Sequence, residues 1–282
     1  MTCFYKYFFI LLFFIAGSLF SVEKPIQRWA AYYSNKEPVE AFSPYQLVVF
    51  NYDEHPLMQG MQDKEIITLG YLSLGEVEKK QPYYEDVKKQ GLLLGENPHW
   101  KGSFYVDVRN KLWQKRVIEE LVPAILFQRF NGVFLDTLDD AEYLENLDPV
   151  KNKGIKQAAI DLVKAIRLHY PPIKIMVNRA YYMLPQVASI INYELGESIY
   201  STYNYDHKKY ELVSEKEYND QVKLLNNAKK LNPNLQIFTL DYWDPHDVEG
   251  YKKIYNVQRA HGFIPYVATL HLDTLIPEPS KP

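Results

Sequence analysis

Residues 132–140 read Gly-Val-Phe-Leu-Asp-Thr-Leu-Asp-Asp, and this stretch decides the fold. Its uninterrupted apolar start is typical of a strand that is buried on both faces of a parallel sheet. Asp136 follows directly on this strand. Burying an ionised side chain there costs several kcal/mol of stability unless the charge is paired or has a function. The stretch therefore predicts a buried parallel strand whose carboxyl end carries a functional acid.

Similar apolar, β-branched or aromatic runs recur along the chain. They are Trp29–Tyr33, Gln46–Phe50, Ile66–Tyr71, Phe104–Val106, Gly132–Leu135, Ile173–Val177, Ile190–Tyr193, Gln236–Leu240 and Phe263–Val267. Helical periodicity lies between them, as at Ile155, Ala159, Leu162 and Ile166. Alternating strands and helices over about 250 residues predict an α/β fold, namely a (β/α)8 TIM barrel in a single domain.

Nine strand candidates are one more than this barrel needs. Phe104–Val106 is the weakest of them, because a loop containing Pro98 leads into it. A doubly wound open sheet is the competing architecture, but it usually begins with a glycine-rich turn. The sequence contains no GxGxxG or GxxxxGK[ST] motif, so the barrel is favoured.

The first 21 residues have the pattern of a secretory signal peptide. Lys6 precedes an apolar run from Tyr7 to Ala16, and small residues follow it. The run is shorter than the ~20 residues of a membrane-spanning helix, although an uncleaved anchor is an open alternative. We expect a domain of residues 22–282, secreted or periplasmic and free of the membrane after cleavage.

Composition excludes several function classes. The net charge is −3, and it becomes −4 when Lys6 leaves with the leader, so the basic excess of a nucleic-acid binder is absent. The only cysteine, Cys3, leaves too, which excludes a thiol nucleophile and a Cys metal site. The sequence has no HExxH pair and no GxSxG elbow. We expect no metal and no cofactor, and a monomer.

Acidic and amide side chains follow several of the predicted strands. Because the active site of a parallel barrel lies at the carboxyl ends of its strands, we expect these side chains to gather at one mouth. Carboxyl groups in one pocket raise one another's pKa, and glycoside hydrolysis needs a raised acid beside an ionised partner. Aromatic residues there could stack on sugars. The strand-end candidates are Tyr71, Glu76, Asp107, Asp136, Asp139, Asn178, Glu194, Glu197, Asp241 and Tyr242.

Some of these acids also have a plain structural interpretation. Glu78 and Glu194 are interpreted as solvated loop acids. Asp107 either lines the mouth or caps the helix that is expected to begin near Asn110. Asp136 is the hardest to explain without a function.

Three segments together resemble glycoside hydrolase family 114. They are Tyr71-Leu-Ser-Leu-Gly-Glu76, Phe104-Tyr-Val-Asp107 and Asn131-Gly-Val-Phe-Leu-Asp136-Thr-Leu-Asp139. The family is typified by endo-α-1,4-polygalactosaminidases with a TIM barrel, and the likeness runs from Trp29 to about Leu275. Two departures stand out. Asn131 replaces the usual Asp before Gly132, and Thr137 replaces the usual Asn; both could alter a sugar subsite.

The resemblance implies roles for the candidate residues. Asp136 is the nucleophile or ion-stabilising carboxylate, and Glu197 is the general acid/base. The residues expected to bind the sugar are Tyr71, Glu76, Asp107, Asp139, Asn178, Asp241 and Tyr242. The implied substrate is an α-1,4-linked polysaccharide that contains galactosamine, and an acidic mouth would attract its ammonium groups.

The separation of the two carboxyl groups distinguishes the mechanisms. Retaining glycosidases hold the pair about 5–5.5 Å apart and inverting ones about 6.5–9.5 Å. We expect Asp136 and Glu197 to lie nearer the shorter separation. A non-catalytic glycan-binding protein of the cell surface, built on the same barrel, is the alternative, and an exported hydrolase that acts on the producer's own polysaccharide is a third possibility.

Overall fold

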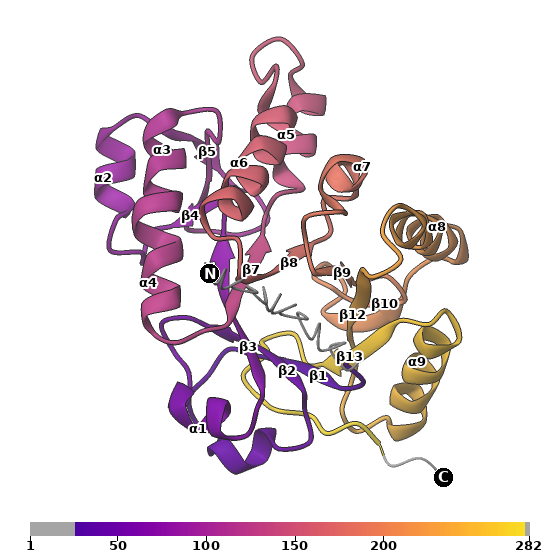
Figure 1. Cartoon of the computed structure of the whole chain (residues 1–282). Coiled ribbons are helices and arrows are strands. Elements are labelled where there is room, and N and C mark those ends of the chain that lie inside the picture. Colours follow the sequence, from indigo (N-terminus) through magenta and orange to yellow (C-terminus); the bar gives the residue numbers. More distant parts are fainter. Residues whose placement is uncertain (1–25, 280–282) are drawn as a thin grey trace, which may run out of the picture.

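The computed structural model describes residues 26–279, and the predicted leader and Cys3 lie outside this range. Eight parallel strands form a nearly closed barrel with helices around it (Figure 1), which confirms the predicted TIM barrel. In sheet order the strands are β1 (Trp29–Tyr32), β2 (Leu47–Asn51), β3 (Ile67–Ser73), β7 (Gly132–Asp136), β8 (Lys174–Asn178), β9 (Tyr193–Glu197), β12 (Gln236–Tyr242) and β13 (Ile264–Ala268).

Helices connect the barrel strands. They are α1 (Met58–Asp63), α2 (Tyr84–Lys89), α3 (Lys111–Arg116), α4 (Val122–Phe127), α5 (Asp140–Leu147), α6 (Ile155–His169), α7 (Leu184–Val187), α8 (Glu215–Leu231) and α9 (Val248–Ala260). Two 3-10 turns, Val39–Phe42 and Tyr181–Met183, and one π turn, Val117–Leu121, complete them. Within residues 26–279, no helix combines the length and apolarity that a membrane crossing requires.

The ninth strand candidate belongs to a separate small sheet. Phe104–Val106 lies in β6 (Ser103–Val106), which pairs antiparallel with β4 (Glu76–Glu78) and β5 (Leu93–Glu96). This sheet is inserted after β3. A hairpin of β10 (Ser201–Asn204) and β11 (Lys209–Leu212) is inserted after β9. Both insertions leave the barrel from the carboxyl ends of strands, which is where TIM barrels place their active sites.

One predicted strand begins three residues later than expected. Ile190 and Ile191 belong to the turn after α7, since both of their N–H groups donate to the carbonyl of Val187, at 2.9 and 3.2 Å. Asn192 precedes the strand, and its side-chain oxygen accepts from the Ile175 N–H of β8 at 3.0 Å. The strand therefore runs from Tyr193 to Glu197, and Glu194 lies inside it.

Aromatic side chains fill the bottom of the barrel. The ring of Phe238 on β12 contacts those of Trp29 on β1 and Tyr193 on β9, at centroid distances of 5.4 and 5.3 Å. The three side chains are buried, and edge-to-face pairs of this kind add to the stability that their burial supplies. Because side chains alternate along a strand, residues at even spacing from these three also face inward, up to the carboxyl ends.

Candidate active site

The last residues of four barrel strands meet at the carboxyl end. They are Asp136 on β7, Asn178 on β8, Glu197 on β9 and Tyr242 on β12. Each faces inward because each stands at even spacing from a residue that faces the barrel interior. The four residues are up to 106 positions apart in the chain, yet side-chain hydrogen bonds from Asn178 and Tyr242 join them at the carboxyl end of the barrel.

Asn178 joins the two candidate catalytic carboxylates. Its side-chain amide nitrogen donates to Asp136 Oδ1 at 2.8 Å and to Glu197 Oε2 at 2.6 Å. Since both oxygens bond to one nitrogen, they lie no more than about 5.4 Å apart, the two bond lengths taken end to end. Only the NH2 group of an amide can donate to two carboxylates, which fixes the orientation of Asn178. This upper limit is below the about 6.5–9.5 Å of inverting pairs and is compatible with the about 5–5.5 Å of retaining pairs.

Glu197 has the environment of a proton donor. Burial raises the pKa of its carboxyl group, and the neighbouring Asp136 charge raises it further. Hydrogen bonds from Tyr242 Oη to Oε1, at 2.5 Å, and from Asn178 lower the pKa and partly offset these effects. The net direction is upward, as a general acid at neutral pH requires.

Two more tyrosines border the pair. Tyr33 and Tyr71 are in ring contact at 5.4 Å. Burial raises the pKa of both phenols, and the Asp136 carboxylate raises each further. Both phenols therefore stay protonated and can act as hydrogen-bond donors. Tyr33 was not among the predicted site residues, although its place at the end of the run Trp29–Tyr33 follows the same strand-end rule.

The chain turns sharply after three of these strands. Thr137, Arg179 and Ser198, which follow Asp136, Asn178 and Glu197, have φ values of 61°, 54° and 53°. Left-handed backbone at a non-glycine residue costs about 1–2 kcal/mol and concentrates at functional sites. Three neighbouring barrel strands, β7, β8 and β9, are thus each followed by a strained residue at this rim.

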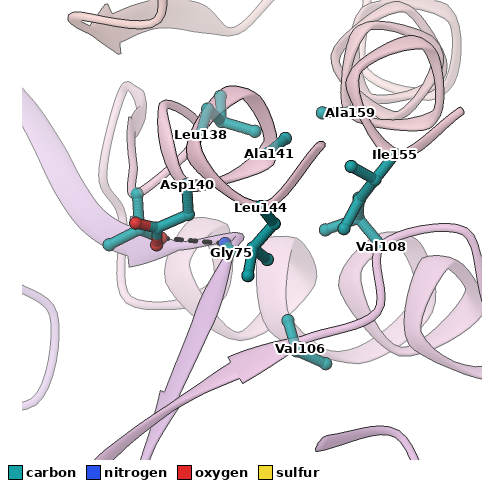
Figure 2. Close-up of a pocket in the computed structure, with 10 residues that line it drawn as sticks. Gly75, Val106, Val108, Leu138, Asp140, Ala141, Leu144, Ile155 and Ala159 are labelled. Carbon is teal, nitrogen blue, oxygen red and sulfur yellow. Dashed lines mark hydrogen bonds between the residues drawn. The ribbon is translucent and has the colours of Figure 1, made fainter. Parts of the chain in front are cut away.

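Thr137 explains one departure from the family pattern. Its hydroxyl bonds to Ser73 Oγ at 2.8 Å and accepts from the Gly75 N–H at 2.8 Å. A Cβ at Gly75 would lie 2.1 Å from the Thr137 carbonyl oxygen, so only glycine fits there. Thr137 thus fastens the end of β7 to the turn after β3. Figure 2 shows Gly75 beside Asp140, over an apolar layer that includes Leu144.

The other departure does not touch the site. Asn131 precedes β7, and its side-chain oxygen accepts from the Thr68 N–H at 2.8 Å, at the amino ends of the strands. The expectation that Asn131 alters a sugar subsite is therefore wrong, because it lies at the opposite end of the barrel.

Asp139 lies beside the pair with a cationic partner. Arg179 Nε is 3.5 Å from Asp139 Oδ2, and both side chains are nearly half exposed. Burial raises the pKa of Asp139, whereas Arg179 lowers it. Arg179 comes directly after Asn178. The backbone turn at the end of β8 therefore positions both the Asn178 amide and the Arg179 guanidinium at the mouth of the barrel.

Glu76 is close to this group but is buried in the small sheet. Asn97 Nδ2 donates to its Oε1 at 2.5 Å, and the hydroxyl of Ser103 donates to its Oε2. Asp140 faces it, and burial together with the Glu76 charge raises the pKa of Asp140. Glu76 is 6% exposed, and both of its carboxylate oxygens accept hydrogen bonds from side chains of the small sheet and its turn.

Asp241 faces away from the pair. It precedes the inward-facing Tyr242, so alternation turns it toward the outside of the barrel. There it accepts from the N–H groups of Tyr200, at 2.9 Å, and Ser201, at 2.8 Å, and from the amide of Gln258, at 2.5 Å. It is fully buried, and burial raises its pKa to about 6. The structure thus does not bring Asp241 to the mouth.

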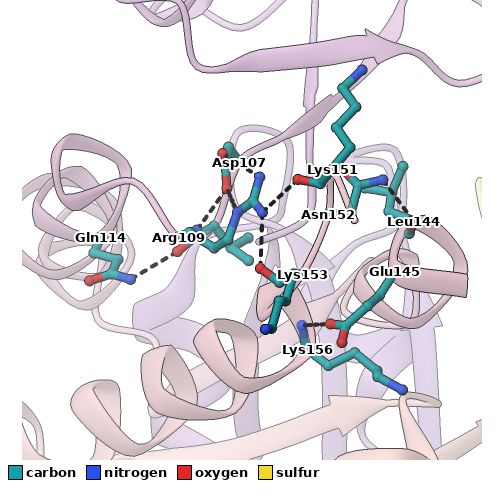
Figure 3. A network of polar contacts seen from close by, with 10 residues as sticks. Asp107, Arg109, Gln114, Leu144, Glu145, Lys151, Asn152, Lys153 and Lys156 are labelled. Atoms are coloured by element: carbon teal, nitrogen blue, oxygen red, sulfur yellow. Dashed lines mark hydrogen bonds and ion pairs between the residues drawn. The ribbon is translucent and has the colours of Figure 1, made fainter. Parts of the chain in front are cut away.

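Asp107 lies outside the cluster as well. Figure 3 shows its carboxylate paired with Arg109, whose Nε and Nη2 donate at 2.8 and 2.9 Å. Arg109 also binds the carbonyls of Lys151 and Lys153, before α6. The helix cap is Asn110, which accepts from the Leu112 N–H. Asp107 therefore holds the small sheet to the α5–α6 loop.

Glu194 corrects an expectation. We interpreted it as a solvated acid, but it is fully buried between the barrel and its helices. Within the part of the chain that the structure describes, neither carboxylate oxygen has a hydrogen-bond partner. Burial raises the pKa of Glu194 well above its usual range, which favours the protonated, neutral form of the side chain.

One family model matches nearly the whole chain. Residues 18–281 match the glycoside-hydrolase family GH114. The chain belongs to this family. Two relatives are an uncharacterized protein of Methanocaldococcus jannaschii, 27% identical over 85% of this chain and 75% of that protein, and one of Thermotoga maritima, 23% identical over 94% and 88%.

Solved structures share the fold of this GH114 chain. The glycoside hydrolase domain of PelA from Pseudomonas aeruginosa superposes with a TM-score of 0.80 at 20% identity, over 90% of this chain and 99% of that one. Aspergillus fumigatus Ega3, solved in complex with galactosamine, has a TM-score of 0.62 at 14% identity, over 88% and 94%. Family membership makes the chain a glycoside hydrolase, whose substrate is a carbohydrate. Among residues 26–279, no group of three or more His, Cys, Asp or Glu side chains is placed to hold a metal ion.

Proposed function

We propose that this protein is a retaining endo-glycosidase that cleaves an α-1,4-linked, galactosamine-containing polysaccharide through Asp136 and Glu197. The observation that carries the proposal is the shared donor, Asn178, which holds one oxygen of each carboxylate within about 5.4 Å of the other. That spacing leaves room for a glycosidic bond, but not for the intervening water of an inverting enzyme.

The two carboxyl groups take different roles in the first step. Glu197, whose pKa is raised by burial and by Asp136, protonates the glycosidic oxygen as the bond to the anomeric carbon breaks. Asp136 attacks that carbon and forms a covalent glycosyl ester. Tyr71 borders Asp136 and Tyr242 binds Glu197, so each carboxyl group has its own phenol nearby.

The second step reverses the role of Glu197. Having lost its proton to the leaving sugar, Glu197 deprotonates a water that attacks the anomeric carbon and releases Asp136. Its hydrogen bonds to Tyr242 and Asn178 stabilise the ionised form that this step needs. One proton therefore returns to Glu197 in each cycle.

Charge favours an amino sugar as substrate. The mouth holds the carboxyl groups of Asp136, Asp139 and Glu197, with Arg179 as their nearest cation. An acidic site attracts a de-N-acetylated sugar, which carries an ammonium group. The Ega3 structure, which shares the fold, contains galactosamine, and this agrees with such a ligand.

The roles of the remaining candidates follow their positions. We assign Tyr71, Asp139 and Asn178 to the substrate-facing side of the site, and Tyr242 to the positioning of Glu197. We assign Glu76, Asp107 and Asp241 to the support of the surrounding loops. We also propose that residues 1–21 direct export and that cleavage leaves residues 22–282, which N-terminal sequencing of the exported protein would test.

A panel of polymers tests the proposed activity. Purified residues 22–282 are incubated with de-N-acetylated α-1,4-galactosamine polymer, its N-acetylated form, chitosan and polygalacturonate, and new reducing ends are measured. We expect release from the first polymer and none from the anionic polygalacturonate. Binding of an oligosaccharide without any release would instead establish the non-catalytic alternative.

A further inference from the structure

Two exposed aromatic side chains from distant segments meet at the rim of the barrel. Trp100 lies in the turn between β5 and β6, and Tyr205 follows β10 in the hairpin. Their ring centroids are 5.7 Å apart with an interplanar angle of 81°. They are 56% and 54% exposed, so part of each ring is accessible to a ligand.

This contact lies on the side of the barrel that carries the carboxyl pair. Both insertions begin at the carboxyl ends of barrel strands, since β4 follows β3 and β10 follows β9. Tyr205 is close enough to Glu197 for that carboxylate to be the second cause, after burial, of its raised pKa. Tyr203 contacts Tyr205 at 5.3 Å and continues the aromatic surface along the hairpin.

A buried acid anchors the loop that carries Trp100. Glu76 binds the side chains of Asn97 and Ser103, which flank the turn. Within the turn, the Trp100 N–H donates to the Asn97 carbonyl at 3.3 Å, and the Trp100 carbonyl accepts from the Ser103 N–H at 3.0 Å. The backbone of Trp100 is therefore held before any ligand arrives.

A second buried acid anchors the hairpin that carries Tyr205. Asp241 accepts from the N–H groups of Tyr200 and Ser201, where the hairpin begins. Farther along, Tyr203 packs on Tyr210 at 5.2 Å, and the hydroxyl of Tyr210 accepts from the Leu270 N–H at 3.3 Å. Two loops that are fixed in this way present their rings in a preformed arrangement, which lowers the entropy lost on binding.

The geometry of the contact leaves ring faces open. In a perpendicular pair, the edge of one ring meets one face of the other, and the exposed fractions of Trp100 and Tyr205 show that ring surface stays accessible beside this contact. The negative face of an aromatic ring attracts the C–H groups of a pyranose, and it also attracts the ammonium of an amino sugar. We propose that Trp100 and Tyr205 together form a binding subsite for one amino-sugar ring of the polymer, beyond the bond that Asp136 and Glu197 cleave. The subsite rests on the proposed function, because it needs a polymer that extends past the cleaved bond.

The dependence of the kinetics on substrate length distinguishes a sugar-binding role of the Trp100–Tyr205 contact from a purely structural role. We compare kcat and KM of the wild type, Trp100→Ala and Tyr205→Ala on de-N-acetylated α-1,4-galactosamine oligomers of two to eight units. For the octamer we expect KM to rise about tenfold with kcat within about twofold, because remote contacts bind substrate and transition state alike. For the shortest oligomer that is cleaved, we expect unchanged kinetics.

Two further variants control for structure. Phe127→Ala removes an aromatic side chain that is 90% exposed at the end of α4, near the amino ends of the strands, and should leave every constant unchanged. Trp100→Leu keeps apolar bulk against Tyr205 but removes the flat face, so it should raise KM for the octamer as Trp100→Ala does. If Trp100→Leu retains the wild-type KM, or if short and long oligomers are affected equally, the contact only fastens the loops and the subsite is refuted.

Binding can be read without hydrolysis. In the Glu197→Gln variant, octamer binding should change the tryptophan fluorescence, since Trp100 is exposed, whereas Trp29 and Trp113 are buried and Trp243 is partly buried. The change should be largely lost in the Glu197→Gln, Trp100→Phe double variant. A Trp100-dependent change with no cleavage by the wild type supports the subsite while the proposed activity fails. Cleavage by the wild type with no Trp100-dependent change in KM or fluorescence overturns the subsite alone.

Discussion

Glu194 and Glu197 lie three residues apart on β9, and the barrel gives them opposite surroundings. Glu197 faces inward, where Asn178 and Tyr242 donate hydrogen bonds to it. Glu194 faces outward and is buried without a hydrogen-bond partner among the described residues. Burial raises the pKa of both groups, but only Glu197 has a second carboxylate beside it. A perturbed acid therefore marks a site only when its neighbours supply the chemistry.

The largest expected effect separates these two acids directly. Glu197→Gln and Asp136→Asn should each lower kcat on the galactosamine polymer by about 10³-fold or more, since a general acid alone contributes about 10²–10⁴. Glu194→Gln is the matched control on the same strand, and its kcat should stay within about threefold of the wild type. Reducing-end assays and melting curves on all three variants provide the measurement. Substantial activity in Glu197→Gln, with Glu194→Gln inactive, would reverse the assignment.

Substitution of Asn178 should have the next largest effect on kcat, because its amide donates a hydrogen bond to each of the two carboxylates. In Asn178→Ala each carboxylate loses one hydrogen bond, and we expect kcat to fall about 10²-fold with KM changed far less. Asn178→Asp replaces a donor by a third acid and should be at least as damaging. An Asn178→Ala enzyme with wild-type kcat would show that the shared donor is not needed to hold the pair.

We expect Tyr242 to set the pKa of Glu197 rather than to take part in the bond cleavage itself. Its hydroxyl donates to Glu197 Oε1 and so lowers the pKa of that carboxyl group. In Tyr242→Phe this bond is lost, so the pKa of Glu197 rises. The basic limb of the kcat/KM profile, which requires protonated Glu197, should therefore move to higher pH, and kcat should fall about tenfold. A basic limb that stays in place would remove Glu197 from the role of acid.

The smallest effect concerns stability. Glu194 stays protonated in the folded protein above pH 4.5, where the unfolded chain loses this proton, so rising pH destabilises the fold. Glu194→Gln removes this dependence. Urea unfolding should show equal free energies of unfolding for wild type and variant near pH 4. Above pH 4.5, the free energy of unfolding of the variant should rise relative to that of the wild type by about 1.4 kcal/mol per pH unit. This rise should stop at the pH where Glu194 ionises in the folded wild type. Parallel curves across pH 4–8 would mean that Glu194 is ionised when folded.

The sequence predicted the barrel because its strands are marked by uninterrupted apolar runs. Eight of the nine runs became barrel strands, and the ninth, Phe104–Val106, lies in the central strand of the small sheet. Its short antiparallel strand has the same local composition as a barrel strand. Only the long-range pairing with β4 and β5, which periodicity does not encode, distinguishes it.

Residues of the candidate site could be predicted only where the sequence predicted the end of a strand correctly. Asp136, Asn178 and Tyr242 end their strands as the apolar runs indicated. Asp241 could not be distinguished from Tyr242, because a shift of one residue in the expected strand end reverses which side chain faces inward. Glu194 was misplaced for the same reason, since β9 begins three residues late. The Trp100–Tyr205 contact joins two insertions and leaves no local pattern.

The configuration of the first product tests the central claim most directly. Proton NMR, recorded on a galactosamine oligomer before the released sugar mutarotates, reports whether the new reducing end is α or β. The spacing that Asn178 imposes on Asp136 and Glu197 predicts two displacements, so the α anomer should form first. A β anomer as the first product would contradict the account, because a water rather than Asp136 would then have attacked the anomeric carbon.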